Sequence, residues 1–406
     1  MEPLVVVPGQ IDVTVLPGRL VVCHAPTSNI PGAGWMVART LLFNEERSCF
    51  NAVILDDEGC TMVMDEERAA DAKRAGLGPF LSVADDRFWT AIHVQLGQSA
   101  NDVPGLISHM AKALMRASIS ILHYSTYGTE IFLVQEKDYE EALACFKSED
   151  LQRKLSALMR SRGTRDVPDA PEPHHVCPPS PGQEPAIRKY APGDGSYSLA
   201  ELDQSLFIVR LKREYFHDVA HTLLHLFLYD SQHYHAGLLQ DDMAEASPVK
   251  AGSDGARTTD ESMPDAVEMP NGEQSMPGGG QRRPEQDPMR FVVAYMESGD
   301  EITLYLDVDD LHLFPSEAIE ICPTPWRGIK LLGRAFKFDE TGVVSAMSKV
   351  SASDNVSILS LSTYRTTITM VEQSQVEDTL KTMSAYLEAR VRRSEVPQVD
   401  MAQLRF

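Results

Sequence analysis

The chain has 406 residues, of which 43% are hydrophobic, and a formal net charge of −22. This length exceeds what one ordinary core requires and indicates about two to four domains. The negative charge disfavours nucleic acids and anionic membrane surfaces as partners, because both require clustered Lys and Arg. No run of about 18 apolar residues is present, so we expect no membrane-spanning helix.

The amino terminus opens directly into strand-like sequence, MEPLVVVPGQIDVTVLPG, and lacks the basic start of a signal peptide. The six cysteines are scattered without a C-x-x-C pair, and most lie among apolar residues, where a thiol packs as a small hydrophobe. These features predict a cytoplasmic protein without disulfide bonds.

Between residues 88 and 146 the pattern predicts a strand, a helix, two strands and a second helix. The segments are, in chain order, RFWTAIHVQL, GLISHMAKALMRA, SISILHYS, EIFLVQ and KDYEEALACFKS. The strands are short apolar runs, and the helices place apolar residues on one face. With one more strand the order is βαββαβ, the ferredoxin-like pattern, in which an antiparallel sheet carries both helices on one face.

Two segments lack the periodicity of a packed element. Residues 160–196 are rich in proline, and residues 242–288 consist largely of Gly, Ser, Pro, Asp and Glu without an aromatic residue. Such segments bury too little apolar surface to offset the entropy of ordering. We therefore interpret 160–196 as a disordered linker and 242–288 as a disordered insertion.

The two parts that remain repeat one another. ISILHYSTYGTEIFLVQEKDYEEAL in the first half matches VSILSLSTYRTTITMVEQSQVEDTL in the second. The offset that aligns Tyr127 with Tyr364 also aligns Gly105 with Gly342, without a gap. Further upstream, MVARTLL resembles DVAHTLL, and CTMVMDEE resembles ITLYLDVD. Each half therefore contains two units, which makes four in all.

We predict an α+β protein of four tandem modules in two duplicated halves. The expected bounds are 1–79 for module 1, 80–159 for module 2, 197–322 for module 3 around the insertion, 323–396 for module 4, and 397–406 for a tail.

The stretch NDVPGLISHMAKALMRASISI resembles the glycine loop, first helix and second strand of an ACT domain. DETGVVSAMSKVSASDNVSIL resembles the same motif with Thr341 in place of proline. The order LFPSEAIEI, Trp326, FDETGVV and LSTY in the second half resembles more closely the CASTOR-type cytosolic arginine sensors, a family of tandem ACT-domain proteins. The resemblance implies a sensor that regulates the TOR kinase pathway through the GATOR complex, with a homodimer as its assembly.

The resemblance also implies an amino-acid site between modules 2 and 4. The residues carried over to this site are Ile119, Ser120, Ile121, Glu340, Thr341, Gly342, Val343, Thr363, Tyr364 and Thr367. Glycine lets the backbone approach a ligand closely, and the amides at a helix start favour an anion. Thr367 stands where the arginine sensors place the aspartate that meets the guanidinium. The predicted ligand is therefore arginine or a neutral or smaller amino acid.

The family's protein-binding motif Y-Q-T-D corresponds here to Y-G-T-E, at Tyr127, Gly128 and Glu130. We expect a protein partner at this patch, for which a GATOR-like complex is the candidate. His217, His221 and His225 have helical spacing, yet no HExxH acid accompanies them. We interpret them as a helix face and expect no metal site and no cofactor.

Two functions remain after these observations. The first is a non-enzymatic amino-acid sensor, in which binding shifts an equilibrium between partner-bound and free forms. The second is a ligand-free ACT-domain scaffold or regulatory subunit that acts through protein–protein contacts alone. We expect no enzyme, because no nucleophile has a local base and no segment remains for a catalytic domain.

Overall fold

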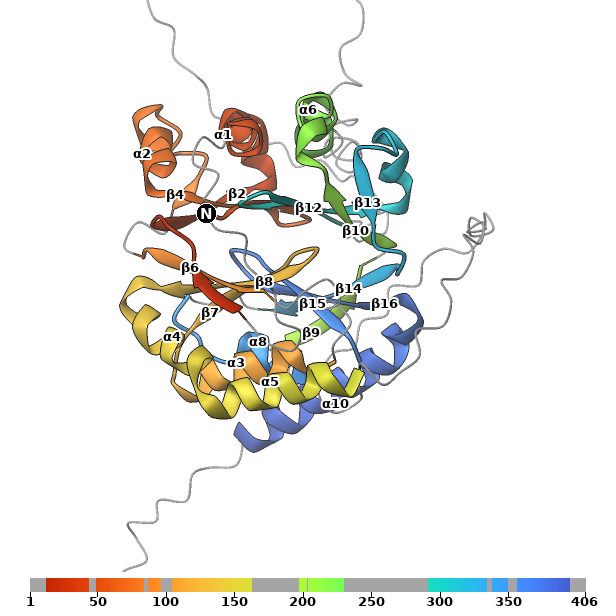
Figure 1. Ribbon diagram of the computed structural model, residues 1–406. Helices are drawn as coiled ribbons and strands as arrows, with labels where there is room; N and C mark the ends of the chain where they lie inside the picture. The colour runs from red at the N-terminus through yellow and green to blue at the C-terminus, as the bar shows by residue number, and fades with distance from the viewer. Residues whose placement is uncertain are drawn as a thin grey trace, which may run out of the picture. The chain divides into compact units, whose positions relative to one another are not determined.

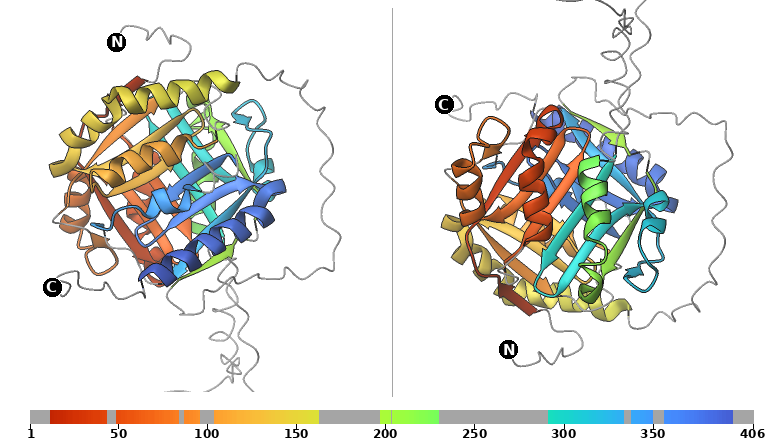
Figure 2. Two further views of the ribbon diagram at one scale, coloured as in Figure 1. Left: turned by 90° about the horizontal axis from the view of Figure 1, so that it is seen from below. Right: turned by 90° about the horizontal axis from the view of Figure 1, so that it is seen from above.

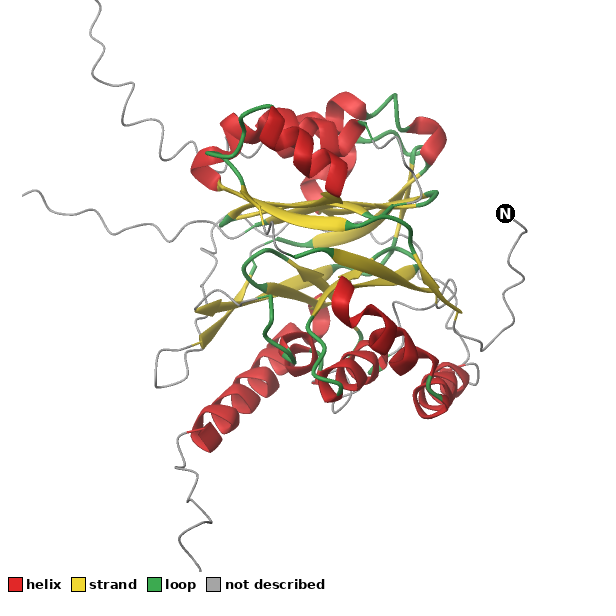
Figure 3. Cartoon of the chain, turned by 90° about the vertical axis from the view of Figure 1, so that its left-hand side faces the viewer, coloured by secondary structure: helices red, strands yellow, loops and turns green. Residues whose placement is uncertain are grey.

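In the computed structural model the strands form one continuous antiparallel sheet that folds into two layers lying face to face, linked by the single pairs Leu206–Trp326 and Leu20–Trp89. Helices cover the outer face of each layer, and each layer is called a sheet below (Figures 1 and 3). The structure describes residues 12–43, 49–83, 87–95, 104–162, 197–202, 204–229, 291–333, 338–349 and 356–394, which all belong to one compact unit. Residues 163–196 of the predicted linker and the whole predicted insertion lie outside this set. Within the set, no helix is long and apolar enough to cross a membrane.

The helices and strands of the two sheets fall into four groups, which we call modules 1 to 4. Module 1 contains β2 (Leu20–Pro26), α1 (Ile30–Leu42), β3 (Asn51–Asp56), β4 (Gly59–Asp65), α2 (Glu66–Arg74) and β5 (Ser82–Val83). Module 3 contains β10 (Leu206–Leu211), α6 (Ala220–Leu224) with a π-helical turn (His225–Tyr229), β11 (Val292–Ser298), β12 (Glu301–Asp307), a 3₁₀ helix (Val308–Leu313) and β13 (Ile319–Ile321). These two modules share one sheet, on which α1 and α6 lie side by side (Figure 2).

Modules 2 and 4 share the second sheet. Module 2 contains β6 (Trp89–Gln95), α3 (Leu106–Arg116), β7 (Ile121–Ser125), β8 (Thr129–Gln135), α4 (Tyr139–Lys147) and α5 (Glu149–Arg162). Module 4 contains β14 (Trp326–Gly333), α8 (Val343–Met347), β15 (Ile358–Ser362), β16 (Thr367–Glu372) and α10 (Val376–Ser394). Gly105 and Gly342 directly precede α3 and α8 with φ values of 80° and 83°, a backbone that glycine adopts without strain.

The last strand of modules 2 and 4 differs from the tandem order expected from the sequence. A helix, α5, follows α4, so the edge of β6 is open to another strand. β1 (Asp12–Val15), which precedes module 1 in the chain, pairs with this edge, and β9 (Tyr197–Glu201), which precedes module 3, pairs with β14 in the same way. In the chain, module 1 thus lies between β1 and the rest of module 2, and module 3 lies between β9 and the rest of module 4.

This exchange moves strands across the expected boundaries. β1 lies within 1–79 but pairs in module 2, and β5 lies within 80–159 but pairs in module 1. β9 lies within 197–322 but pairs in module 4. The physical reason is that an antiparallel edge leaves backbone donors and acceptors unpaired, and a short strand from elsewhere in the chain satisfies them.

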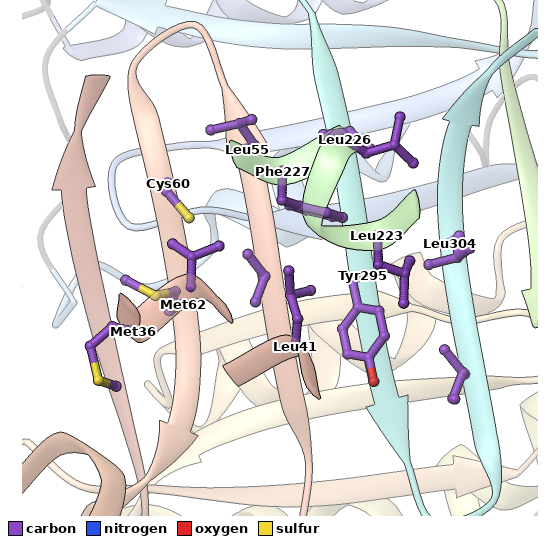
Figure 4. Packing of buried hydrophobic residues seen from close by; sticks show 14 of the residues in the cluster. Met36, Leu41, Leu55, Cys60, Met62, Leu223, Leu226, Phe227, Tyr295 and Leu304 are labelled. Carbon is purple, nitrogen blue, oxygen red and sulfur yellow. The ribbon is translucent and has the colours of Figure 1, made fainter. Parts of the chain in front are cut away.

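Apolar side chains fill the space between the sheets and under the helices. The layer between the sheets includes Trp89, Tyr124, Tyr305 and Trp326, each fully buried. Under α1 and α6, side chains of modules 1 and 3 form one continuous cluster, in which Met36 and Leu41 share a core with Leu223 and Phe227 (Figure 4). Strands with apolar layers on both faces read as continuous hydrophobic runs, and this is why the strands of the sequence do not alternate strictly.

Each sheet contains a central seam between its two modules, and the two seams differ in the number of paired residues. β3 and β11 connect modules 1 and 3 through a ladder from Asn51 to Asp56. β7 and β15 connect modules 2 and 4 at the single pair of Tyr124 and Leu361. The second seam therefore lacks most of the backbone hydrogen bonds of the first.

Serine hydroxyls replace these missing bonds. The backbone N–H of Ser360 donates to Ser125 Oγ at 3.0 Å, and the backbone N–H of His123 donates to Ser362 Oγ at 2.9 Å. Ser125 and Ser362 are the same position of the repeated S-T-Y motif, so the two bonds are related by the internal duplication. The motif occurs twice because each copy supplies one half of this seam.

Substitution of these serines tests the seam. Ser125→Ala and Ser362→Ala each leave a buried N–H without an acceptor and should lower the free energy of unfolding by about 1–3 kcal/mol in urea titrations. Ser82→Ala removes a hydroxyl from an exposed position on the edge strand β5 and serves as the control. Equal stability of all three variants would contradict this role.

Candidate functional site

The crevice between modules 2 and 4 brings together the two segments that the sequence predicts to face one another. Ser120 lies directly before β7, and its hydroxyl donates to the backbone carbonyl of Glu340 at 3.1 Å. Glu340 belongs to the loop before α8. A serine of one repeat therefore contacts the glycine loop of the other repeat.

A second contact holds the same loop. The Gln135 side-chain amide donates to the carbonyl of Phe338 at 2.9 Å, and the Phe338 ring packs edge-on against Trp89 at a centroid distance of 5.5 Å. On the opposite side, Gly342 approaches α3 so closely that an added Cβ would lie 3.0 Å from Met115 Sδ. The loop is thus fixed by module 2 at both ends.

The turn between β15 and β16 forms the other wall of the crevice. Thr363 and Thr366 close this turn, because Thr363 N–H donates to the Thr366 carbonyl at 2.8 Å and Thr366 N–H donates to Thr363 Oγ1 at 3.1 Å. The N–H of Tyr364 donates to Thr61 Oγ1 of module 1 at 3.0 Å. Module 1 therefore supports the turn from behind.

A cavity of about 30 Å³ lies between the loop and the turn. Its lining residues are Ser120, Ile121, Leu122, Phe338, Glu340, Val343, Thr363, Tyr364, Arg365, Thr366 and Thr367. Four of these carry aliphatic hydroxyls, and Glu340 and Arg365 supply one carboxylate and one guanidinium. The volume corresponds to about one water molecule, so the crevice must widen to hold a whole amino acid.

Buried charge surrounds the back of the turn. Lys330 Nζ lies 3.0 Å from Asp56 Oδ2 and 2.5 Å from Asp57 Oδ1. Burial raises the pKa of Asp56 to about 6, although Lys330 opposes this shift. His24 stacks on Tyr364 at 5.2 Å, and its pKa is lowered to about 4 by burial and by the nearby cations Arg365 and Lys330.

The structure places seven of the ten predicted site residues at the cavity. Of the other three, Ile119 is packed in the core of module 2, Thr341 is exposed, and Gly342 faces Met115. Sequence reasoning missed four lining residues, which are Leu122, Phe338, Arg365 and Thr366. Each is a neighbour of a repeated motif, and the repeat itself was the signal that could have identified them.

The predicted partner patch differs from expectation. Glu130 is 1% exposed and pairs through its Oε2 with His123 Nε2 at 2.9 Å. The N–H of Tyr127 donates to Thr303 Oγ1 at 3.0 Å, and the N–H of Gly128 donates to Glu301 Oε1 at 3.4 Å, so this turn contacts module 3. Glu130 is therefore closed to a protein partner, whereas Tyr127 and Gly128 remain partly exposed.

The histidine series does not form a metal centre within the described residues. His217 precedes α6 in a turn, and the rings of His221 and His225 stack with centroids 6.4 Å apart. Over the described part of the chain, no group of three or more His, Cys, Asp or Glu side chains is arranged to hold a metal ion. The face of α6 that bears His221 is open to solvent.

Two segments of the chain match the family model of the ACT domain, residues 86–148 and residues 321–385. These ranges cover β6 to α4 of module 2 and β14 to the first part of α10 of module 4, and the strand order of both modules is ferredoxin-like. No curated protein sequence matches the chain.

Solved structures with detectable similarity include aspartate kinase from Synechocystis, at 12% identity and a TM-score of 0.29. The match covers 94% of this chain and 56% of the kinase chain. The regulatory subunit of aspartate kinase from Thermus thermophilus, in its ligand-free form, matches at 17% identity and a TM-score of 0.25, covering 33% of this chain and 94% of its own. A Vibrio cholerae protein of unknown function, described as a possible transport protein, matches at 17% identity and a TM-score of 0.24, covering 36% and 91%.

The lowered pKa of His24 predicts a pH-dependent stability. Between pH 6.5 and about 4 the unfolded chain binds a proton at His24 and the folded chain does not, so this residue removes stability as the pH falls through that range. His24→Phe keeps an aromatic ring against Tyr364 and abolishes the titration. The melting temperature of the wild type should therefore fall more between pH 7 and pH 4.5 than that of the variant. Asp56 titrates in both proteins, so the comparison isolates His24. An equal fall in melting temperature for the wild type and the variant would show that His24 is not held neutral.

Proposed function

We propose that the chain is a non-enzymatic regulatory protein that binds a free amino acid in the crevice between modules 2 and 4. The convergence of both copies of the repeated motif on one cavity carries this proposal. The ACT-domain match of modules 2 and 4 supports it, because ACT domains are amino-acid-binding regulatory modules. Modules 1 and 3 have the same strand order and are proposed to be ACT modules as well.

The lining of the cavity matches the two ends that every amino acid shares. A buried ammonium requires an acceptor such as the Glu340 carboxylate, and a buried carboxylate requires donors such as Arg365 and the threonine hydroxyls. Among the described residues that line the cavity, Glu340 is the one carboxylate, and a cationic side chain would need a second. The site therefore suits a neutral or small amino acid best, with arginine as the alternative that the sequence resemblance favours.

Binding is proposed to move the loop that contains Glu340. The ligand is proposed to displace the Glu340 carbonyl from the Ser120 hydroxyl, since the cavity has room for about one water molecule. A ligand that binds only the open form shifts the equilibrium between the two forms. We propose that this shift is transmitted to a protein partner in TOR-pathway signalling, for which a GATOR-like complex is the candidate.

The small cavity also favours a second candidate function. A protein that never opens this crevice would act as a scaffold, through the pairing of its modules and contacts with other proteins. The serine seam and the two loop contacts would then be purely structural.

A thermal-shift screen against the twenty amino acids distinguishes the two functions. A ligand at 100 times its Kd stabilises the folded state by about 2.7 kcal/mol, which raises the melting temperature measurably. Ser120→Ala should abolish the response. Ser357→Ala removes the equivalent serine of module 4, which lies outside the cavity lining, and should retain the response. A flat response of the wild type to all twenty amino acids would favour the scaffold.

The identity of residue 367 should control the response to arginine. Thr367→Asp places a carboxylate in the cavity wall, and a charged hydrogen bond contributes about 1.5–3 kcal/mol, which is roughly a tenfold to hundredfold gain in affinity. Thr367→Asn is the matched neutral control and should give little gain. Calorimetric titration with arginine measures both. Equal affinity of the two variants would show that residue 367 does not face the ligand side chain.

A further inference from the structure

Lys330 is a fully buried cation that joins module 4 to module 1. Its side chain leaves β14 and reaches the turn between β3 and β4, where Asp56, Asp57 and Glu58 surround it. The distances from Nζ to their carboxylate oxygens are 3.0, 2.5 and 3.8 Å, respectively. We refer to Lys330, Asp56, Asp57 and Glu58 as the charge cluster.

The charge cluster lies behind the turn that lines the cavity. Arg365, in that turn, places its Nε 3.6 Å from Glu58 Oε2. The Thr366 hydroxyl donates to the carbonyl of Leu331, the residue after Lys330, at 2.6 Å. The position of the turn is thus linked to module 1 through both its backbone and its charged side chains.

The internal duplication shows what the fold itself requires. In the other half of the molecule, His93 occupies the strand position of Lys330, because His93 pairs with Ile131 as Lys330 pairs with Ile368. Ser298, Gly299 and Asp300 stand in place of the three acids, and Gly128 stands in place of Arg365.

Only the backbone part of the support is common to both halves. The N–H of Tyr127 donates to Thr303 Oγ1 just as the N–H of Tyr364 donates to Thr61 Oγ1, and both distances are 3.0 Å. The same docking of turn onto sheet therefore forms without a buried lysine or an acidic triad. The charge cluster supports only the turn at Tyr364, whereas the equivalent turn meets Glu301 through the N–H of Gly128.

Such a cluster is not explained by stability. Transfer of a lysine and its carboxylates out of water carries a large desolvation cost, and replacement of a buried ion pair by apolar side chains is often neutral or stabilising. What a buried, multiply bonded ion cluster does provide is a defined geometry for the segments that it joins. Here those segments are β14, the acidic turn of module 1, and the cavity turn.

We propose that the charge cluster is a positioning device for the amino-acid site, which holds residues 363–367 in the geometry that the ligand requires. This inference rests on the proposed function. Lys330 acts through the turn and does not itself line the cavity. Module 1 thereby becomes a determinant of affinity at a site formed by modules 2 and 4.

The test is a variant that removes Lys330 and its two nearest carboxylates and leaves Glu58 beside Arg365, Lys330→Met with Asp56→Asn and Asp57→Asn. The first measurement is amide hydrogen exchange of the turn, which requires no ligand. The amides of Tyr364 and Thr366 should exchange about tenfold faster than in the wild type, which corresponds to about 1.4 kcal/mol of local opening. The turn from Thr126 to Glu130 in the same molecule should exchange at the wild-type rate. His93→Met, the equivalent change in the other half, should leave residues 363–367 unaffected.

The second measurement repeats the thermal-shift screen with the twenty amino acids on the triple variant, and calorimetry follows for the amino acid with the largest shift in the wild type. Its Kd should rise about tenfold. Unchanged exchange at the turn overturns the proposal, and so does faster exchange with an unchanged Kd. If the wild type binds none of the twenty amino acids, the proposed function fails, and the exchange measurement alone decides whether the cluster positions the turn.

Discussion

The weak seam between β7 and β15 is the constraint on which the rest of the structure depends. The sheet of modules 1 and 3 is joined by a full ladder, whereas the sheet of modules 2 and 4 is joined at one residue pair and two serine hydroxyls. A full ladder would bring the two modules together along their whole length. The incomplete one leaves a crevice in which Ser120 meets the loop of Glu340 and the turn of Thr363. The site therefore exists because one of two equivalent seams is left incomplete.

The repeat made much of this arrangement predictable. Tyr127 and Tyr364 identified the duplication, and the ferredoxin-like order of β6 to α4 follows from local periodicity alone. The facing of Ser120 and Glu340 was predicted from resemblance and is seen as a hydrogen bond. Their role in ligand binding stays a prediction. Local pattern cannot reveal that β1 and β9 complete distant modules, because a short strand carries no signal of which edge it pairs with.

Residues whose environment comes from another module were the hardest to place from the sequence. Glu130 is an acid of the kind usually found at the surface, yet it is buried with His123 because module 3 packs over its turn. Lys330 likewise has no local sequence feature that marks it as buried, and its acidic partners come from another module far away in the chain. An ionisable side chain is normally assigned to the surface, and only the tertiary partner that neutralises it reverses this assignment. Such contacts across modules are invisible to periodicity and spacing.

The hydrogen bond between Ser120 and the Glu340 carbonyl determines what kind of regulation is physically available. A ligand that must break the bond between Ser120 and the Glu340 carbonyl has, by necessity, different affinities for the closed and open forms. The turn on the opposite wall is hydrogen-bonded to Thr61, and its Arg365 approaches Glu58. A movement of this turn therefore changes its contacts with module 1. Coupling of this kind is reciprocal. If a partner that binds the acidic turn of module 1 changes the affinity for the ligand by some factor, the ligand changes the affinity for that partner by the same factor. A partner that docks on module 1 would therefore sense the amino acid without contacting it.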